Sequence, residues 1–151
     1  AKSLGMKIKH DKNGTLPGGV ESIVKNKETT HDFIAMDIKT SPEKYKEKIN
    51  TAENLKDKDI KKLLERSVKI ISSLSDKNYE IRTVLVPHLV EKEDIKKIAE
   101  LLPENAAWRF AQFRNENCLD PSYNDIIPYT DSELSELVTF AKTLIKDSVL
   151  R

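Results

Sequence analysis

Hydrophobic positions along the chain follow two spacings, one typical of strands and one typical of helices. Short apolar or alternating runs at 6–10, 33–36, 79–86 and 107–113 predict four strands. Apolar residues between and after these runs recur at helical spacing, most clearly from Leu134 to Ile145. Because strands and helices alternate, we predict an α/β fold with a parallel sheet of about four strands and right-handed crossover helices, either an open sheet or part of a (β/α) barrel.

Local signals mark where several of these elements begin and end. Asp11–Gly14 is predicted as the turn that ends the first strand, and 115–129 as a long polar loop. Ser41 before Pro42 predicts a helix start, and Thr130 with Glu133 forms a capping-box pattern. The lysine-rich stretch 44–62 leads into apolar positions at helical spacing, so we interpret it as the solvated face of an amphipathic helix.

Polar side chains stand at the end of each predicted strand. Ligands of parallel α/β sheets bind beyond the carboxyl ends of the strands, so these residues are the first candidates for chemistry. They are Asp11, Asn13, Asp37, Lys39, His88, Gln112 and Arg114. Taken singly, each is also explained as ordinary turn or surface chemistry.

Composition excludes several classes of function. The 26 Lys and Arg residues balance 25 Asp and Glu residues, and this near-zero net charge gives no reason to expect a nucleic-acid partner. No apolar run approaches the roughly 18 residues that span a bilayer, and the N-terminus lacks a secretory signal pattern, so we expect a cytoplasmic protein without a membrane partner. Gly18–Gly19 lacks the residues of a phosphate-binding loop.

Cys118 is the single cysteine of the chain. It excludes an internal disulfide framework and any cysteine-based metal site built within these 151 residues, and it is most simply a free thiol. The first five residues have no initiator Met and resemble the last turn of a helix that stops at Gly5. We therefore expect the chain to be an excised part of a longer protein.

Four motifs, taken in order, resemble the radical S-adenosylmethionine activating enzymes of glycyl-radical proteins. They are Asp-Lys-Asn-Gly at 11–14, Met-Asp-Ile-Lys at 36–39, Arg-Thr-Val-Leu-Val-Pro at 82–87 and Gln-Phe-Arg-Asn-Glu-Asn at 112–117. The nearest resemblances are to pyruvate formate-lyase activating enzyme and to the activating protein of anaerobic ribonucleoside-triphosphate reductase. Each motif alone is weak, and their joint order over the whole chain is the specific signal.

This resemblance implies a partial (β/α)6 TIM-like barrel. In that family a Cys-x-x-x-Cys-x-x-Cys motif follows the first strand and a Gly-Gly-Glu motif follows the second, and this chain contains neither. The resemblance thus implies that residues 1–151 are a single domain, the C-terminal portion of such a barrel without its cluster-binding N-terminal part. The cluster-free fragment is expected to be inactive and to retain no cofactor or metal of its own.

The resemblance also implies the chemistry of the parent protein. Such an enzyme binds a 4Fe-4S cluster and S-adenosylmethionine, receives an electron from a donor such as flavodoxin or ferredoxin, and generates a glycyl radical on a partner protein. The cofactors supply the difficult chemistry and the protein supplies positioning. The alternative reading is a non-catalytic α/β interaction domain, or a small-molecule-binding domain without a cluster.

Particular residues acquire expected roles from the resemblance. Those expected to contact S-adenosylmethionine are Asp11, Asn13, Asp37, Lys39, Gln112 and Phe113. Lysine can pair with the methionine carboxylate, while carboxylates accept from ribose hydroxyls or hold a small cation. Phe113 is expected to stack on adenine, with core packing as the alternative. Arg82 and His88 are expected on the substrate side, against a buried ion pair for Arg82 and a solvated side chain for His88.

Overall fold

The computed structural model describes residues 7–25, 32–49, 59–74 and 78–151, and these form one parallel sheet with helices. The strands pair side by side in the order in which they occur in the sequence. They are β1 (Lys9–Asn13), β2 (Phe33–Asp37), β3 (Tyr79–Leu85), β4 (Trp108–Gln112) and β5 (Ser148–Leu150). The α/β class and the parallel sheet are confirmed, and this sequential order is the one that a section of a (β/α) barrel has.

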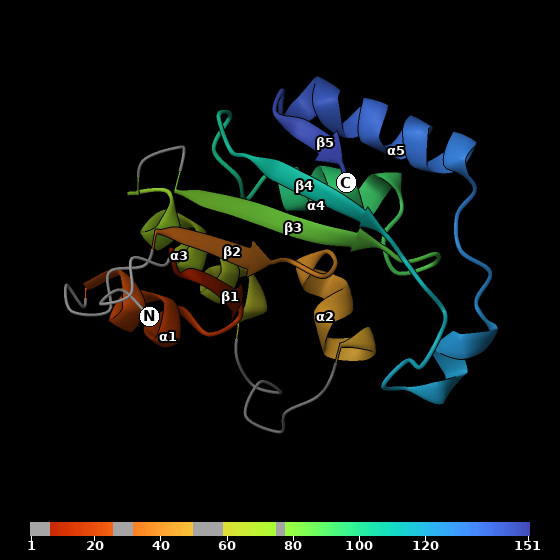
Figure 1. Cartoon of the computed structure of the whole chain (residues 1–151), viewed down its shortest axis with the longest axis horizontal. Helices are drawn as coiled ribbons and strands as arrows, with labels where there is room; N and C mark the ends of the chain where they lie inside the picture. Colours follow the sequence, from red (N-terminus) through yellow and green to blue (C-terminus); the bar gives the residue numbers. More distant parts are fainter. Residues whose placement is uncertain (1–6, 26–31, 50–58, 75–77) are drawn as a thin grey trace.

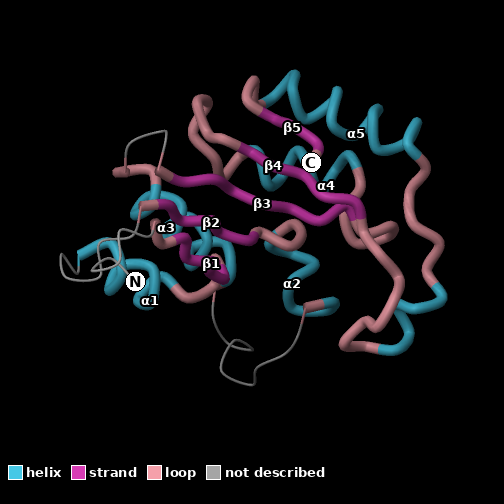
Figure 2. Tube along the Cα trace, in the orientation of Figure 1, coloured by secondary structure: helices cyan, strands magenta, loops and turns pink. Residues whose placement is uncertain are grey.

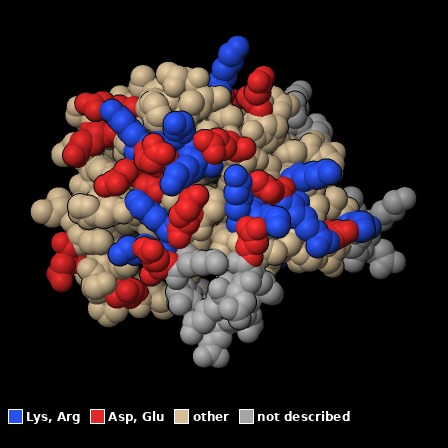
Figure 3. Space-filling view, turned by 180° about the vertical axis from the view of Figure 1, so that it is seen from behind, with Lys and Arg blue, Asp and Glu red and all other residues tan. Residues whose placement is uncertain are grey.

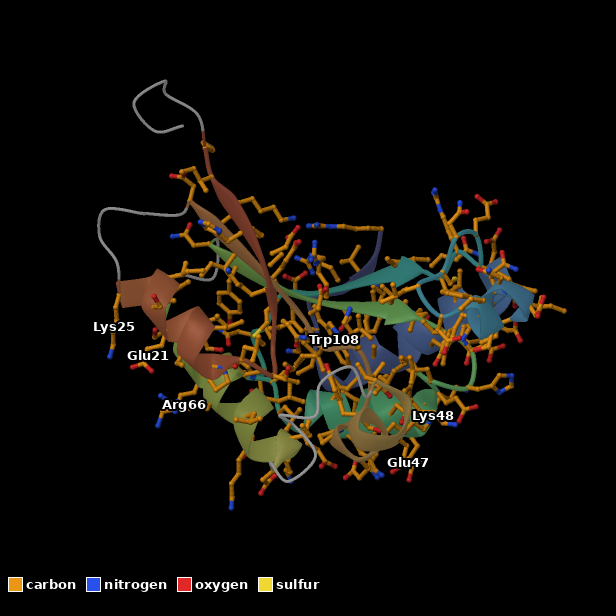
Figure 4. The ribbon with its side chains drawn as sticks, turned by 90° about the horizontal axis from the view of Figure 1, so that it is seen from below. Glu21, Lys25, Glu47, Lys48, Arg66 and Trp108 are labelled. Carbon is orange, nitrogen blue, oxygen red and sulfur yellow. The ribbon has the colours of Figure 1, made fainter. Side chains whose placement is uncertain are left out.

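The helices lie mainly on one side of the sheet. In Figures 1 and 2, α1 (Pro17–Lys25), α3 (Ile60–Ile71) and α4 (Lys92–Ala99) lie behind the strands, and Figure 4 shows them together on one side. The remaining helices are α2 (Pro42–Lys48), the 3₁₀ helix η4 (Pro121–Asp125) and α5 (Asp131–Leu144). None of the helices in the described ranges is long and apolar enough to cross a membrane.

The hydrophobic core fills the space between the helices and the sheet face that they cover. Alternate residues of each strand point into it, as the two-residue period of a strand requires. The largest fully buried side chains there are Trp108, Tyr79, Phe110, Ile34, Met36, Ile38, Leu64, Ile71, Ile81, Leu85, Ile95 and Ile98. The other alternate residues lie on the opposite face, which we call the open face; it carries Lys9, Asp11, Asp37, Glu80, Arg82, Val84 and Arg109.

Gly14 brings the end of β1 close to the end of β2. Its N–H donates to the carbonyl oxygen of Asp37 at 3.2 Å. A Cβ at this position would lie 2.9 Å from a side-chain carbon of Leu64 and 3.1 Å from the Asp37 carbonyl oxygen. A larger residue would therefore require the Leu64 side chain to move and the Asp37 carbonyl to shift slightly, and glycine allows the approach as it stands.

The predicted helix starts are largely confirmed. Thr130 and Glu133 form the capping box at the start of α5, where each side chain accepts from the other residue's backbone N–H. Ser41 precedes Pro42 at the start of α2, but its side chain makes no capping bond. The Ser41 hydroxyl instead donates to Asp94 at 2.6 Å, which ties α2 to α4.

The position of the first strand differs from the prediction. The apolar residues of 6–10 were the basis for a strand there, yet β1 runs from Lys9 to Asn13, and Met6 lies outside the described residues. Asp11 is consequently inside the strand and not in a turn. Lys9, Asp11 and Asn13 pair in register with β2 and are exposed on the open side, so these polar residues are compatible with a strand and the pairing overrides the local turn signal.

Two further predictions need correction. The stretch 44–62 does not form one continuous helix, because α2 ends at Lys48 and α3 begins at Ile60; residues 50–58 between them lie outside the described residues. The sequence prediction also lacked β5, a three-residue strand that follows α5 and pairs with β4. Such a short strand gives too few alternating positions to be recognised from the pattern of the chain.

The helix-covered side presents a mixed charged surface. In Figure 3, which views the molecule from behind, basic and acidic side chains alternate across that face. Glu21 of α1, for example, pairs with Arg66 of α3 at 2.7 Å on the outer surface (Figure 4). The surface that this view displays has no large patch of one sign, as expected from a net charge of +1.

Candidate functional site

The candidate site lies on the open face, at the carboxyl ends of β1 and β2 and beside the middle of β3. The register pairs Asn13 with Asp37 and Asp37 with Arg82, so the last residues of β1 and β2 stand side by side with Arg82 of β3. Gly14 donates to the backbone carbonyl of Asp37, and Arg82 binds its side chain. Both contacts fix the residue at which β2 ends. The strands therefore bring together residues that are up to about 70 positions apart in the sequence.

Arg82 is the centre of an ionic cluster on this face. Its guanidinium donates to one oxygen of Asp37 from Nε at 2.9 Å and from a terminal nitrogen at 2.8 Å. The other terminal nitrogen lies 3.1 Å from a carboxylate oxygen of Asp11. The Lys39 ammonium lies 3.8 Å from the second oxygen of Asp37. The predicted residues Asp11, Asp37, Lys39 and Arg82 are thus brought together.

A pocket of about 230 Å³ opens beside this cluster. Asp37, Lys39 and Arg82 form its polar side, and the remaining lining is apolar: Ile38, Ile49, Val84, Val86 and Leu89. Complete small-molecule sites usually measure about 300–1,000 Å³, so this pocket fits a part of a ligand. A zwitterionic ligand with an apolar ring suits this lining, because a cation, a carboxylate and aliphatic side chains are all within it.

A second ionic group on the open face was not predicted. Glu80 is 1% exposed although it faces away from the helices. Lys9 lies 3.1 Å from one of its oxygens and Arg151 lies 2.8 Å from the other, and these two long side chains cover it. The alternation of the charged Glu80 and Arg82 with Tyr79, Ile81 and Thr83 was the signal that could have identified a charged open face.

A neighbouring pocket of about 210 Å³ joins the two groups. Three arginines line it, Arg82, Arg109 and Arg151, together with Asp37. Each arginine has a carboxylate partner in the structure, since Arg109 pairs with Asp147 at 2.8 Å and Arg151 with Glu80. The charges of this pocket therefore compensate one another, and Val84, Phe110 and Ala111 make much of the remaining lining apolar, so it is not a strongly basic site.

Three predicted residues, Asn13, Gln112 and Phe113, make local contacts within the chain. The Asn13 side-chain oxygen accepts from the N–H of Thr15 at 3.0 Å and from its hydroxyl at 2.9 Å, an ordinary Asx turn. Gln112 donates to the carbonyl oxygen of Tyr129 at 3.1 Å. Phe113 is buried and meets the Tyr123 ring edge-on, with 6.4 Å between centroids. This contact is consistent with core packing, the alternative role given above for Phe113.

His88 does not line the pocket beside Asp37, Lys39 and Arg82. It is exposed, has a positive φ of 65°, and lines a separate pocket of about 170 Å³ with Lys48, Tyr123 and Ile126. Its carbonyl oxygen accepts from the Lys44 ammonium at 3.1 Å. Histidine tolerates this left-handed conformation better than most residues, and glycine would adopt it without strain.

Asp94 of α4 anchors α2, the helix that follows Asp37 and Lys39 in the sequence. It is 3% exposed, and it accepts from Ser41 at 2.6 Å, from the Lys44 ammonium at 2.6 Å and from the N–H of Glu91 at 2.9 Å. Burial alone would raise the pKa of Asp94. The hydrogen bonds from Lys44, Ser41 and Glu91 outweigh that effect and lower its pKa below the ordinary value.

The residues present do not fit an iron–sulfur cluster. Such clusters are held by three or four cysteine thiolates, and Cys118 is the one cysteine in this sequence. Within the described ranges, no group of three or more His, Cys, Asp or Glu side chains is arranged to hold a metal ion. Any cluster that works with this chain must be bound by residues outside these 151.

The chain is similar to one curated protein over its full length. It is 32% identical over 153 residues to a protein of Methanocaldococcus jannaschii named "Putative glycyl-radical enzyme activating enzyme". The match covers all of this chain and 61% of that protein. No family model and no solved structure matches the chain. The relationship confirms the resemblance to activating enzymes of glycyl-radical proteins that the sequence motifs indicate.

Proposed function

We propose that this chain, a relative of an activating enzyme of glycyl-radical proteins, forms the C-terminal portion of such an enzyme's barrel and supplies part of its S-adenosylmethionine site. The observation that supports this most is the full-length similarity, combined with the grouping of Asp37, Lys39 and Arg82 beside one pocket. Because the chain spans 61% of its relative, the activity of the whole protein is part of the proposal.

Lys39 is suited to pair with the carboxylate of S-adenosylmethionine. Its ammonium is half-exposed and has a 3.8 Å contact with Asp37, which a shorter contact with a ligand can replace. Arg82 holds one oxygen of Asp37 from two nitrogens and so fixes the direction of the carboxylate. The other oxygen is directed toward Lys39 and is proposed to accept from the ribose hydroxyls.

The other residues predicted for the site have different proposed roles. Asp11 pairs with Arg82 from β1, across the intervening strand β2, so it is proposed to act through the arginine. Gln112 is exposed and keeps capacity to hydrogen-bond a ligand edge. Asn13, Phe113 and His88 make the local contacts described above, and we propose no direct ligand contact for them.

The parent enzyme requires components that this chain does not contain. In enzymes of this kind, the cluster and S-adenosylmethionine supply the radical chemistry when bound. We propose that the cluster is bound by a cysteine triplet that precedes this chain in the parent polypeptide, by about 60–90 residues, allowing ~30 residues or more per βαβ unit. Residues 1–151 alone are then inactive. A cytoplasmic glycyl-radical enzyme is the proposed protein substrate, and flavodoxin or ferredoxin the proposed electron donor.

The isolated chain is expected to bind S-adenosylmethionine no better than with millimolar affinity. A few hydrogen bonds contribute about 1 kcal/mol each, while association costs at least ~4 kcal/mol. Titration followed by ¹⁵N NMR should shift the amides of Asp37, Lys39 and Arg82 first. Lys39→Ala should weaken the binding by about fivefold, as expected for a partly exposed charge-assisted contact.

Lys62→Ala is the matched control for this titration. Lys62 is an exposed lysine of α3 whose ammonium pairs with Asp59 at 3.3 Å, away from the pocket. It should bind S-adenosylmethionine as the unaltered chain does. Amide shifts confined to regions outside the strand ends would contradict the site, and micromolar affinity would show that these strand ends contribute far more than proposed.

A further inference from the structure

The segment that carries Lys39 leaves the sheet immediately after Asp37. The last sheet bond of this segment is from the N–H of Ile38 to the carbonyl oxygen of Arg82, at 3.0 Å. Beyond it the backbone has no further strand partner, yet it runs through the protein interior, since Ile38, Thr40 and Ser41 are buried. Buried backbone groups need hydrogen-bond partners, so side chains must supply them here.

Side chains of β3 and α2 provide two of these partners, and the segment's own Thr40 side chain adds a third contact. The Thr83 hydroxyl donates to the carbonyl oxygen of Ile38 at 2.8 Å. The N–H of Lys39 donates to the hydroxyl oxygen of Tyr45 at 2.7 Å. The Thr40 hydroxyl donates to the carbonyl oxygen of Leu89. The backbone on both sides of the Lys39 side chain is thus held by specific contacts.

Tyr45 is placed for this role by the helix to which it belongs. It lies on α2, which the Ser41–Asp94 and Lys44–Asp94 hydrogen bonds fix to α4. The Tyr45 side chain is 4% exposed, so its ring has little freedom to move away from the strand end. The hydroxyl group therefore sits at a fixed point beneath Lys39.

The pKa of the Tyr45 hydroxyl depends on its burial and on the charge of Asp37. Burial raises the pKa of Tyr45 above its ordinary value, and the negative charge of Asp37 raises it further. The hydroxyl consequently keeps its proton at neutral pH. In the hydrogen bond with the N–H of Lys39 the protonated hydroxyl is the acceptor, so this contact is kept across the neutral pH range.

We infer that Tyr45 is a positioning residue for the ligand site, and that it acts by fixing the backbone of Lys39. Its hydroxyl sets the direction in which the Lys39 side chain leaves the backbone, and so determines where the ammonium meets the ligand. The inference deepens the proposed function and rests on it for the identity of the ligand. The positioning of the Lys39 backbone itself does not depend on that identity.

Tyr45→Phe tests this inference, with Tyr129→Phe as its matched control. Both changes remove one tyrosine hydroxyl; the hydroxyl of Tyr129 donates to the carbonyl oxygen of Val90 at 3.2 Å. In Tyr45→Phe, amide hydrogen exchange at Lys39 should accelerate about tenfold, the usual effect of losing one hydrogen bond, while amides in the middle of β3 keep their rates. Tyr129→Phe should leave the exchange rate of Lys39 unchanged.

The ligand experiment separates positioning from a general structural effect. S-adenosylmethionine, titrated into the chain to about 10 mM, should bind Tyr45→Phe roughly fivefold more weakly than the unaltered chain. In a Lys39→Ala background the Tyr45→Phe change should have no further effect, because its action passes through Lys39. An equal loss in both backgrounds would overturn the inference.

Failure of the proposed function gives a different result from failure of this inference. If the unaltered chain shows no amide shifts with S-adenosylmethionine, the ligand assignment is wrong, and the exchange rate of the Lys39 amide alone decides whether Tyr45 positions this backbone. An unchanged Lys39 exchange rate in Tyr45→Phe would overturn the inference whatever the ligand does.

Discussion

Trp108→Ala is expected to lower the free energy of unfolding by about 3–5 kcal/mol, the usual range for removing a large aromatic side chain from a core. Trp108 is fully buried on the helix-covered face of β4 (Figure 4), with its ring 4.5 Å from that of Phe110. Domains of this size are stable by about 5–15 kcal/mol, so the variant should lose a large share of its stability. Urea denaturation followed by circular dichroism measures this.

Trp108 also supports the strand end of the candidate site. Its indole N–H donates to the Thr83 hydroxyl at 3.0 Å, and that hydroxyl donates to the carbonyl oxygen of Ile38. Trp108→Phe keeps most of the ring but loses this hydrogen bond, so it should cost only about 1–2 kcal/mol. A loss below 1 kcal/mol in Trp108→Ala would contradict the central place of this residue in the core.

Asp94→Asn is expected to destabilise the chain by about 2 kcal/mol at pH 7. Breaking a fully buried ion pair typically costs about 3–5 kcal/mol, and the effect is smaller here because the Lys44 side chain is 28% exposed. The amide keeps the shape of Asp94 but removes the charge that Lys44 and Ser41 bind. Ser122→Ala, a change at an exposed position in η4, is the control and should cost far less.

The effect of Asp94→Asn should depend on pH. The pKa of Asp94 is lower in the folded chain than in the unfolded chain, where it is about 3.9. Its contribution to stability is therefore complete above the unfolded-state value and is lost as the pH falls through the folded-state value. The difference between Asp94→Asn and the unaltered chain should shrink below about pH 4. A difference that stays constant from pH 7 to pH 3 would contradict this.

The fold was predictable where apolar spacing was strong. The buried strand 33–36, the strand 79–86 and the helix whose apolar positions begin at Leu134 all follow from patterns that tertiary contacts reinforce. The predicted position of β1 was wrong because the residues of β1 are polar. Its position depends on pairing with β2 rather than on its own sequence. β5 is held by β4 and α5, so no local pattern could identify it.

The candidate site was predictable only in part, for a similar reason. Asp37 and Lys39 follow a strand that is recognisable alone, and Arg82 lies inside another, so the parallel sheet brings them together. Asn13 and Phe113 were candidates by position, but turn chemistry and packing against Tyr123 use their side chains. Glu80 and Tyr45 were not among the candidates: the ion-pair partners of Glu80 are distant along the chain, and no sequence pattern shows that the nearby Tyr45 hydroxyl binds the N–H of Lys39.

The most direct test of the account is cleavage of S-adenosylmethionine by the complete, cluster-loaded polypeptide. Under a low-potential reductant, we expect formation of 5′-deoxyadenosine and methionine, measured by liquid chromatography. Asp37→Ala and Lys39→Ala should each lower the rate at subsaturating S-adenosylmethionine by about tenfold or more, corresponding to roughly 1.4 kcal/mol of lost stabilisation, and Lys62→Ala should not. A cluster-loaded polypeptide that forms no 5′-deoxyadenosine, or whose rate is unaffected by both site variants, would contradict the account.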